Sequence, residues 1–329
     1  MSHNNKYLWR RIVAFCDVRT HKEIDETRQA LFSVSKKWRK EFKLHLWIHP
    51  SSAYCKALKA QNYRLANSIW DFSGDCIDCR SETVVKAVLD DGEELHVRRL
   101  VARGDFDPSI GHNYAIRCAS KNGQAAVVEL LLQDSRVDPS ADRNAAILWA
   151  SDLNRANVVK LLLQDGRADP SALYNYAIRW ASASGHVDVV QLLLKDPRVD
   201  PSDEDNLAIR YASENGRVDV VQLLLQDPRV DPSAGNNSAI RWASKEGHFD
   251  VVQLLLQHPR VDPSDEDNES VKRASECGHA DVVQLLLQDP RVNPATDDYA
   301  IKWASINRHV DVVQLLLQDG RVDPSAGNN

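Results

Sequence analysis

Residues 175–197 read NYAIRWASASGHVDVVQLLLKDP, two helix-like segments separated by a glycine. The segment through Ser182 has the length and spacing of a short helix, in which the small residues Ala177 and Ala181 lie four positions apart and allow close packing. Gly185 follows as a residue that takes a positive φ at a helix end at little cost. The first half therefore predicts a short helix that ends at a glycine.

The second half of the stretch, VDVVQLLL, is apolar over most of a helical circumference. This pattern predicts a second helix that is buried on several sides. Asp188 lies in its first turn, where a carboxylate interacts favourably with the helix dipole, and the helix ends before Pro197. A turn at Asp200-Pro201-Ser202 then leads into the next unit.

The same pattern recurs every 31 residues, which is the spacing from Asn144 to Asn175. Regular units begin near Asn113, Asn144, Asn175, Asn206, Asn237, Asn268 and Asp298. Two diverged units precede them, around Gln61 and Gly92. A helix pair of this size cannot bury its apolar faces alone and must stack on its neighbours. The sequence therefore predicts an all-α solenoid of about nine units.

Composition places the chain among folded proteins of aqueous compartments. Hydrophobic residues make up 43% and charged residues 27%, and no apolar run approaches the about 18 residues of a membrane span. The N-terminal residues lack the apolar stretch of a secretory signal, and the six scattered cysteines are typical of reduced thiols. We expect a cytoplasmic or nuclear location, in a host cell if the protein is viral.

Charge is divided unevenly along the chain. Residues 1–50 contain 11 Lys+Arg and five Asp+Glu, a net charge of +6. Because the whole chain has a net charge of −6, residues 51–329 carry −12. An acidic array argues against a phosphate-binding surface along the solenoid. The basic head is better explained as solvated helix faces than as a nucleic-acid site, and we expect neither nucleic acid nor membrane as a partner.

The regular units resemble the ankyrin repeat, which consists of a turn, a short helix, Gly-His and a longer Leu-rich helix. Residues 185–194, GHVDVVQLLL, carry the resemblance most strongly. Residues 175–182, NYAIRWAS, stand where the family has Thr-Pro-Leu-His-x-Ala-Ala, and the unit is shorter than the usual 33 residues. The resemblance implies protein binding in a concave groove. It also implies a shortened finger loop, for which a β-hairpin is one open possibility.

Residues 7–48 depart from the period and resemble an F-box, with LWRRIVAF followed by LFSVSKKW. The family's early Leu-Pro is missing, and the connecting residues are longer than usual. The resemblance implies a Skp-family linker and a cullin as partners. The residues that would bind the linker are Leu8, Trp9, Ile12, Val13, Leu31, Val34 and Trp38. The alternative is a helical cap that covers the first repeat.

Three parts follow from these patterns. Residues 1–50 are predicted to form the F-box-like segment or cap, residues 51–112 the degenerate repeats, and residues 113–329 seven regular repeats.

No pattern of residues indicates catalysis or a cofactor. Cys76 and Cys79 form a CxxC pair, but zinc needs four ligands and no second pair exists. Histidines recur at one repeat position, each followed two residues later by aspartate, as in His186 and Asp188. A catalytic group is needed once, so hydrogen bonding at the helix start explains the series better. We predict a non-enzymatic protein without metal or cofactor.

Two further series have two interpretations each. Trp149, Trp180, Tyr211, Trp242 and Trp303 share one position, which favours packing between repeats over the anchoring of a ligand. A basic residue precedes this position in most units. Pairing with aspartates of the turns is favoured there over recognition of an acidic partner. The members are Arg117, Arg179, Arg210, Arg241, Lys272 and Lys302.

Positions that differ between units are free of the packing demands of the repeat, and they match those that line the groove in ankyrin proteins. The predicted groove residues are Lys121, Asn122, Asp142, Arg143, Asp152, Leu153, Leu173, Tyr174, Tyr176, Glu204, Asp205, Glu214, Lys245 and Glu246. Aromatic side chains often anchor partners, so we expect the strongest contacts in the units that begin at Asn144 and Asn175. The alternative is that these positions vary by sequence drift on a surface that binds no ligand.

The functional hypothesis is a non-catalytic adaptor that holds a target protein in its groove. If the F-box resemblance holds, the protein is a substrate receptor of a cullin-type ubiquitin ligase. The alternative is an ankyrin scaffold without a link to ubiquitin ligases.

Overall fold

The computed structural model describes residues 57, 59, 94–103 and 106–322. The chain divides into two compact units, one of residues 1–119 and 129–137 and the other of residues 120–128 and 138–329. The structure contains 15 α-helices in the described residues: α7 (Glu94–Val101), α8 (Ile110–Asn122), α9 (Ala125–Leu132), α10 (Ala141–Asp152), α11 (Ala156–Asp165), α12 (Ala172–Ser184), α13 (Val187–Leu194), α14 (Asp203–Glu214), α15 (Val218–Leu225), α16 (Ala234–Glu246), α17 (Phe249–Leu256), α18 (Asp265–Cys277), α19 (Ala280–Leu287), α20 (Tyr299–Ile306) and α21 (Val310–Gln318). A 3₁₀ helix, η2 (Thr296–Asp298), precedes α20.

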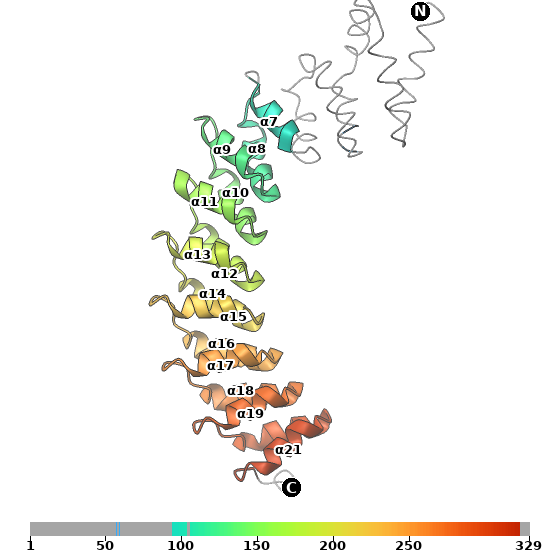
Figure 1. Ribbon diagram of the computed structural model, residues 1–329. Coiled ribbons are helices and arrows are strands. Elements are labelled where there is room, and N and C mark those ends of the chain that lie inside the picture. Colours follow the sequence, from blue (N-terminus) through green and yellow to red (C-terminus); the bar gives the residue numbers. More distant parts are fainter. Residues whose placement is uncertain (1–56, 58, 60–93, 104–105, 323–329) are drawn as a thin grey trace, which may run out of the picture. The chain divides into compact units, whose positions relative to one another are not determined.

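In the second unit the helices form a repeating stack of pairs (Figure 1). The first helices, α10, α12, α14, α16, α18 and α20, pack in series, and so do the second helices, α11, α13, α15, α17, α19 and α21. The predicted all-α solenoid is confirmed for these residues. Among the helices of the described residues, none combines the length and the apolar character that crossing a bilayer requires.

The core explains the spacing of apolar residues in the repeat. Ala177, Ile178 and Ala181 of α12 are fully buried, as are Val190 and Leu193 of α13. The small alanines allow neighbouring first helices to approach closely, as the spacing predicts. Gly185 ends α12 with a φ of 83°, and Asp188 lies in the first turn of α13, so both helix-end predictions are confirmed.

The glycine position has a second function that the sequence does not reveal. A Cβ on Gly216 would lie 2.7 Å from Nδ1 of His248, which belongs to the following unit. Gly216 also has a φ of 67°, which L side chains rarely adopt. Glycines at this position therefore lie against a side chain of the next unit: Gly216, Gly247 and Gly278 lie against a histidine, and Gly123 and Gly185 lie against an arginine.

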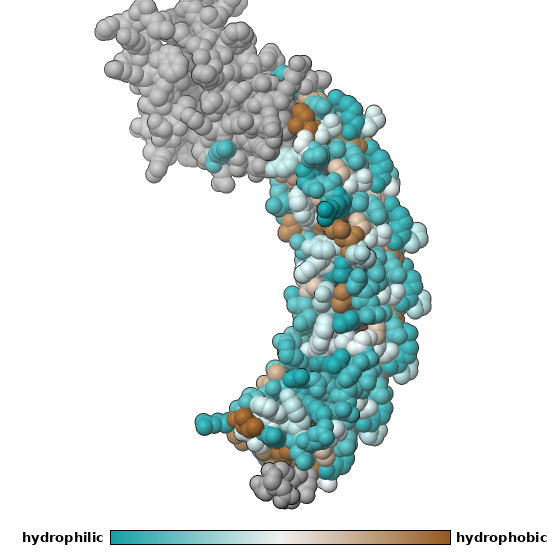
Figure 2. Space-filling model, turned by 180° about the vertical axis from the view of Figure 1, so that it is seen from behind, coloured by the Kyte–Doolittle hydropathy of each residue, from teal (hydrophilic) through white to brown (hydrophobic). Residues whose placement is uncertain are grey.

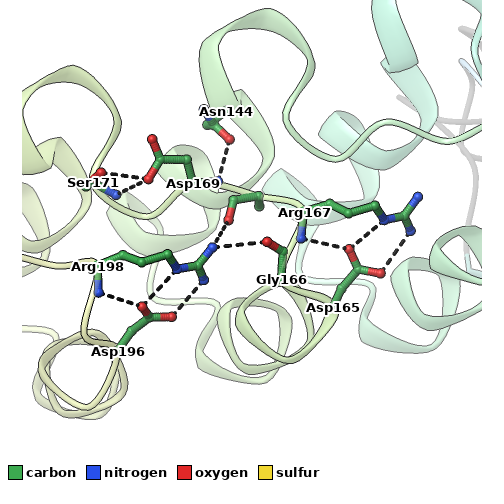
Figure 3. Close-up of polar contacts among 9 residues, drawn as sticks. Asn144, Asp165, Gly166, Arg167, Asp169, Ser171, Asp196 and Arg198 are labelled. Atoms are coloured by element: carbon green, nitrogen blue, oxygen red, sulfur yellow. Dashed lines mark hydrogen bonds and ion pairs between the residues drawn. The ribbon is translucent and has the colours of Figure 1, made fainter.

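An arginine after the second helix connects each unit to the one before it (Figure 3). Arg198 forms a bidentate ion pair with Asp196, with its Nη2 2.7 Å from Oδ2. Nη1 of the same guanidinium donates hydrogen bonds to the carbonyl oxygens of Ala168 and Gly166, at 2.8 and 3.0 Å. Equivalent contacts recur at Arg229, Arg291 and Arg321.

We expect these Asp–Arg pairs to make the protein sensitive to acid. The hydrogen bonds from arginine lower the pKa of Asp196, Asp227, Asp289 and Asp319, and they lower that of Asp134 to about 2. A pKa depressed by folding stabilises the folded state above the unfolded value of about 3.9, and the contribution is lost as the pH falls through the folded value. The urea midpoint should therefore fall between about pH 4 and about pH 2.

One unit contains a natural variation that serves as a control. His258 stands at the position of the pairing aspartate, and burial, followed by the charge of Arg260, lowers its pKa. Arg260 nevertheless keeps its bond to the carbonyl of Val230, at 2.8 Å. H258D should restore the pair and raise the urea midpoint at pH 7 but not at pH 2. An equal gain at both pH values would contradict this account of acid sensitivity.

Candidate protein-binding surface

Three consecutive residues with left-handed backbone angles open the first helix of the units from α8 to α18, whereas the last unit has two, Asp297 and Asp298. In α12 these are Leu173, Tyr174 and Asn175, with φ of 56°, 57° and 53°. The same conformation recurs at 142–144, 204–206, 235–237 and 266–268. No strand occurs in the described residues, so a tight left-handed turn takes the place of the β-hairpin that remained possible from the sequence.

An asparagine, buried in most units, holds the turns of the regular units in place. Asn175 Oδ1 accepts a hydrogen bond from the backbone N–H of Asp200 at 2.9 Å, and its Nδ2 donates to Oδ2 of Asp203 at 2.8 Å. Asn237 makes the equivalent two bonds to Asp262 and Asp265, both at 2.8 Å. Asparagine tolerates the left-handed region better than most residues. The residue that marked the start of each unit in the sequence therefore joins that unit to the next.

The basic series also belongs to the turns, but its partners differ from the prediction. Arg179 Nη2 donates to the carbonyl oxygen of Leu173 at 2.8 Å, and Arg241 Nη2 donates to that of Gly235 at 3.0 Å. Arg117 binds the carbonyls of Gly111 and His112 in the same way. The left-handed turn leaves carbonyl oxygens without a hydrogen-bond partner in the helix, and the arginine guanidinium donates hydrogen bonds to them. Pairing with a carboxylate of a turn occurs at Lys272, whose Nζ lies 3.5 Å from Oδ2 of Asp297.

The histidine series also contacts the preceding unit rather than its own helix start. Nε2 of His186 lies 2.9 Å from the carbonyl oxygen of Asp152, and Nε2 of His248 lies 2.9 Å from that of Glu214. A carbonyl oxygen only accepts, so Nε2 carries the proton in these rings. The histidines do form hydrogen bonds, but with carbonyl oxygens of the preceding unit rather than with the start of their own helix. The contacted carbonyls belong to Asp152 and Glu214, two of the predicted groove residues.

The aromatic series forms a partly exposed stack along the first helices. The ring of Trp180 lies 5.5 Å from Tyr176 and 6.2 Å from Tyr211, and Tyr211 lies 6.4 Å from Trp242. The predicted packing between units is therefore present. However, Trp149 and Trp180 remain 36% and 41% exposed. Neither residue is among the groove positions predicted from the sequence, although the four-residue spacing of Tyr176 and Trp180 places these two side chains on one helix face.

The exposed face of α12 runs from the left-handed turn to the end of the helix. Leu173 and Tyr174 are 43% and 69% exposed at one end, and Tyr176 and Trp180 continue along the helix. Burial, followed by the negative charge of Asp152, raises the pKa of Tyr176. Asp152 and Leu153 stand at the end of α10, and Leu153 is 39% exposed. We call Trp149, Leu153, Leu173, Tyr174 and Trp180 the apolar patch.

The remaining predicted groove residues lie at the same two positions of other units. Asp142 and Arg143 belong to the turn of α10, and Glu204 and Asp205 to that of α14, all of them exposed. At the helix ends Lys121 and Asn122 are exposed, Glu214 is half-buried, and Lys245 forms an ion pair with Glu246 at 2.9 Å. The hydrogen bond from Lys245 lowers the pKa of Glu246. The structure thus places the set at the two ends of successive first helices.

Carboxylates dominate this surface beyond α12. Glu204, Asp205, Glu214 and Asp267 have no ion-pair partner among the described residues, although positive groups lie near them in sequence. Arg273 instead pairs with Glu269 and Glu276 of its own helix, at 2.7 and 2.8 Å. On the face drawn in Figure 2, hydrophilic atoms cover much of the described chain, and hydrophobic atoms appear in smaller groups in its upper half and again near its lower end.

Several predicted residues lie outside the described part of the chain. These include the F-box-like positions Leu8, Trp9, Ile12, Val13, Leu31, Val34 and Trp38, and the pair Cys76 and Cys79. In the residues that the structure describes, no group of three or more His, Cys, Asp or Glu side chains is placed to hold a metal ion.

Comparison with known proteins identifies the repeated units. A family model described as ankyrin repeats (3 copies) matches residues 168–236, 211–298 and 242–328. No curated protein matches the chain significantly. The matched residues include α12 to α21, with their Gly-His pairs and Leu-rich second helices. Residues 168–328 of this protein therefore consist of ankyrin repeats.

Proposed function

We propose that the protein is a non-catalytic binding module that holds another protein across the exposed faces of its first helices. The observation that carries the proposal is the apolar patch, in which five large side chains along α10 and α12, from the turn of α12 to the end of α10, are each at least 36% exposed. Exposed tryptophan and tyrosine side chains are the residues that most often dominate protein interfaces. Ankyrin repeats in residues 168–328 agree with a role in protein–protein interaction.

Site-specific cross-linking in a cell lysate tests this proposal. A photoreactive amino acid at Tyr174 should capture discrete proteins, whereas the same group at the exposed Gln191 of α13 should not. Gln191 is a matched control because it lies on the second helix of the same repeat. Identical capture patterns at the two positions, or no capture at Tyr174, would contradict binding at this surface.

A narrower role rests on the N-terminal residues. We propose that residues 1–50 dock on a Skp-family linker, which would make the protein a substrate receptor of a cullin-type ubiquitin ligase. The support is the spacing of Leu8, Ile12, Leu31 and Trp38 within an F-box-like pattern. The full chain should then co-purify with the linker and a cullin, and L8D and W38A should abolish this while cross-linking at Tyr174 persists. Co-purification that survives both substitutions, or its absence from the full chain, would leave an ankyrin scaffold.

A further inference from the structure

The turn of α12 carries two unfavourable features at the same residues. Leu173 and Tyr174 adopt left-handed angles, which side chains with a Cβ avoid for steric reasons. The same two side chains are largely exposed, so burial does not compensate for the backbone conformation. The side-chain bonds of Asn175 and Arg179 hold the turn in this conformation, and residues held in sparsely populated backbone regions occur preferentially at functional sites.

The unit that begins at Asn237 shows that the turn does not require leucine and tyrosine at these positions. The turn of α16 has Gly235 and Asn236 at the equivalent positions, with φ of 61° and 57°. Glycine adopts this region freely, and asparagine is among the residues that tolerate it. Leu173 and Tyr174 therefore serve something other than the turn itself, and their exposed apolar atoms are suited to contact with a partner.

The apolar patch adjoins an unneutralised acidic turn. Helix α12 packs directly on α14, and Asn175 of one turn donates its hydrogen bond to Asp203 of the next. Glu204, Asp205 and Glu214 of α14 form no ion pair among the described residues. A partner that contacts both α12 and α14 therefore meets aromatic and aliphatic atoms first and carboxylates immediately beside them.

We propose that the recognised partner is a peptide segment in which an apolar or aromatic anchor stands beside lysine or arginine residues. The anchor binds over Leu173, Tyr174 and Trp180, and the basic side chains bind the carboxylates of Glu204, Asp205 and Glu214. This proposal rests on the binding role proposed above and specifies the chemistry of the partner. The acidic residues add specificity and speed of association, while the apolar contacts supply most of the affinity.

The test pans a phage-displayed library of random 12-residue peptides on the immobilised full chain. Enriched peptides should share a hydrophobic or aromatic anchor and a positive net charge. L173G/Y174N, which copies the turn of α16, should weaken binding of a synthetic enriched peptide at least about tenfold. E204Q/D205N should weaken it about threefold and reduce its salt dependence. D219N removes an exposed charge on α15 and should change nothing.

The variants separate loss of binding from loss of folding. L173G/Y174N relieves the strained turn, so its melting temperature should equal or exceed that of the original chain. Enriched peptides that are acidic or uncharged, or that bind L173G/Y174N equally well, would overturn this inference and leave a protein-binding role elsewhere on the repeats. If no peptide is enriched beyond beads coated with an unrelated protein, the proposed binding function fails as well.

Discussion

Asn237→Ala is expected to destabilise the protein by about 2–4 kcal/mol, because it removes two hydrogen bonds between repeats and places a Cβ residue on a left-handed backbone. Asn237 is 5% exposed, and its side chain bonds Asp262 and Asp265 of the next unit. Without it the backbone N–H of Asp262 loses its partner. Chemical denaturation followed by circular dichroism measures the loss.

Asn237→Gly separates the two contributions to this effect. Glycine accepts the φ of 54° without strain but makes neither side-chain bond. The glycine variant should therefore be about 1 kcal/mol more stable than the alanine variant and still less stable than the original chain. Asn215→Ala, at an exposed position, serves as the control and should change stability little. Equal stability of Asn237→Ala and Asn215→Ala would show that the asparagines do not join the repeats.

Replacing Ser182, Ser213 and Ser244 together by alanine is expected to stabilise the protein by about 2–3 kcal/mol. All three side chains are fully buried, and their hydroxyl groups have no hydrogen-bond partner among the described residues. A buried polar group without a partner costs free energy, and alanine fills nearly the same space and favours the helix. The measurement is the shift of the denaturation midpoint for one, two and three substitutions.

The last unit contains a matched control for the serine series. Ser305 is exposed, and its Oγ donates to the carbonyl oxygen of Ile301 at 2.7 Å. Ser305→Ala should therefore bring no comparable gain. If the triple variant is less stable than the original chain, the buried hydroxyl groups must donate to helix carbonyls in solution, as Ser305 does.

The sequence predicted the repeating elements well because their signals are local. Helix spacing, the glycine that ends α12 and the proline after α13 act on neighbouring residues, and each recurs in unit after unit. A single repeat therefore carried enough information to predict an all-α solenoid. The predicted surface positions also lie where variation between units placed them, at the turns and the helix ends, although their role in binding stays a prediction.

The partners of the serial polar residues were not predictable in the same way. The sequence shows that arginine, histidine and asparagine recur, but these side chains bond to groups elsewhere. His186 reaches a carbonyl 34 residues earlier, and Asn175 reaches a backbone N–H 25 residues later. Arg179 reaches a carbonyl that only the left-handed turn exposes. The sequence pattern favoured hydrogen bonds at the helix start for the histidines and turn carboxylates for the basic series. The histidines bond to the preceding unit, and Arg117, Arg179 and Arg241 bond to turn carbonyls, whereas Lys272 does pair with a turn carboxylate.

The helix pair, its period and its stacking follow from the amino-acid sequence alone, because they depend on apolar spacing and on glycine and proline along one short segment. The shape of the turns and the neighbours of each surface side chain required the folded structure. Leu173 and Tyr174 became recognisable as strained and exposed, and Trp180 as a partly exposed member of an aromatic stack, once adjacent units were in place. Exposure and hydrogen-bond partners at these positions depend on residues one repeat away, which the local sequence pattern does not show.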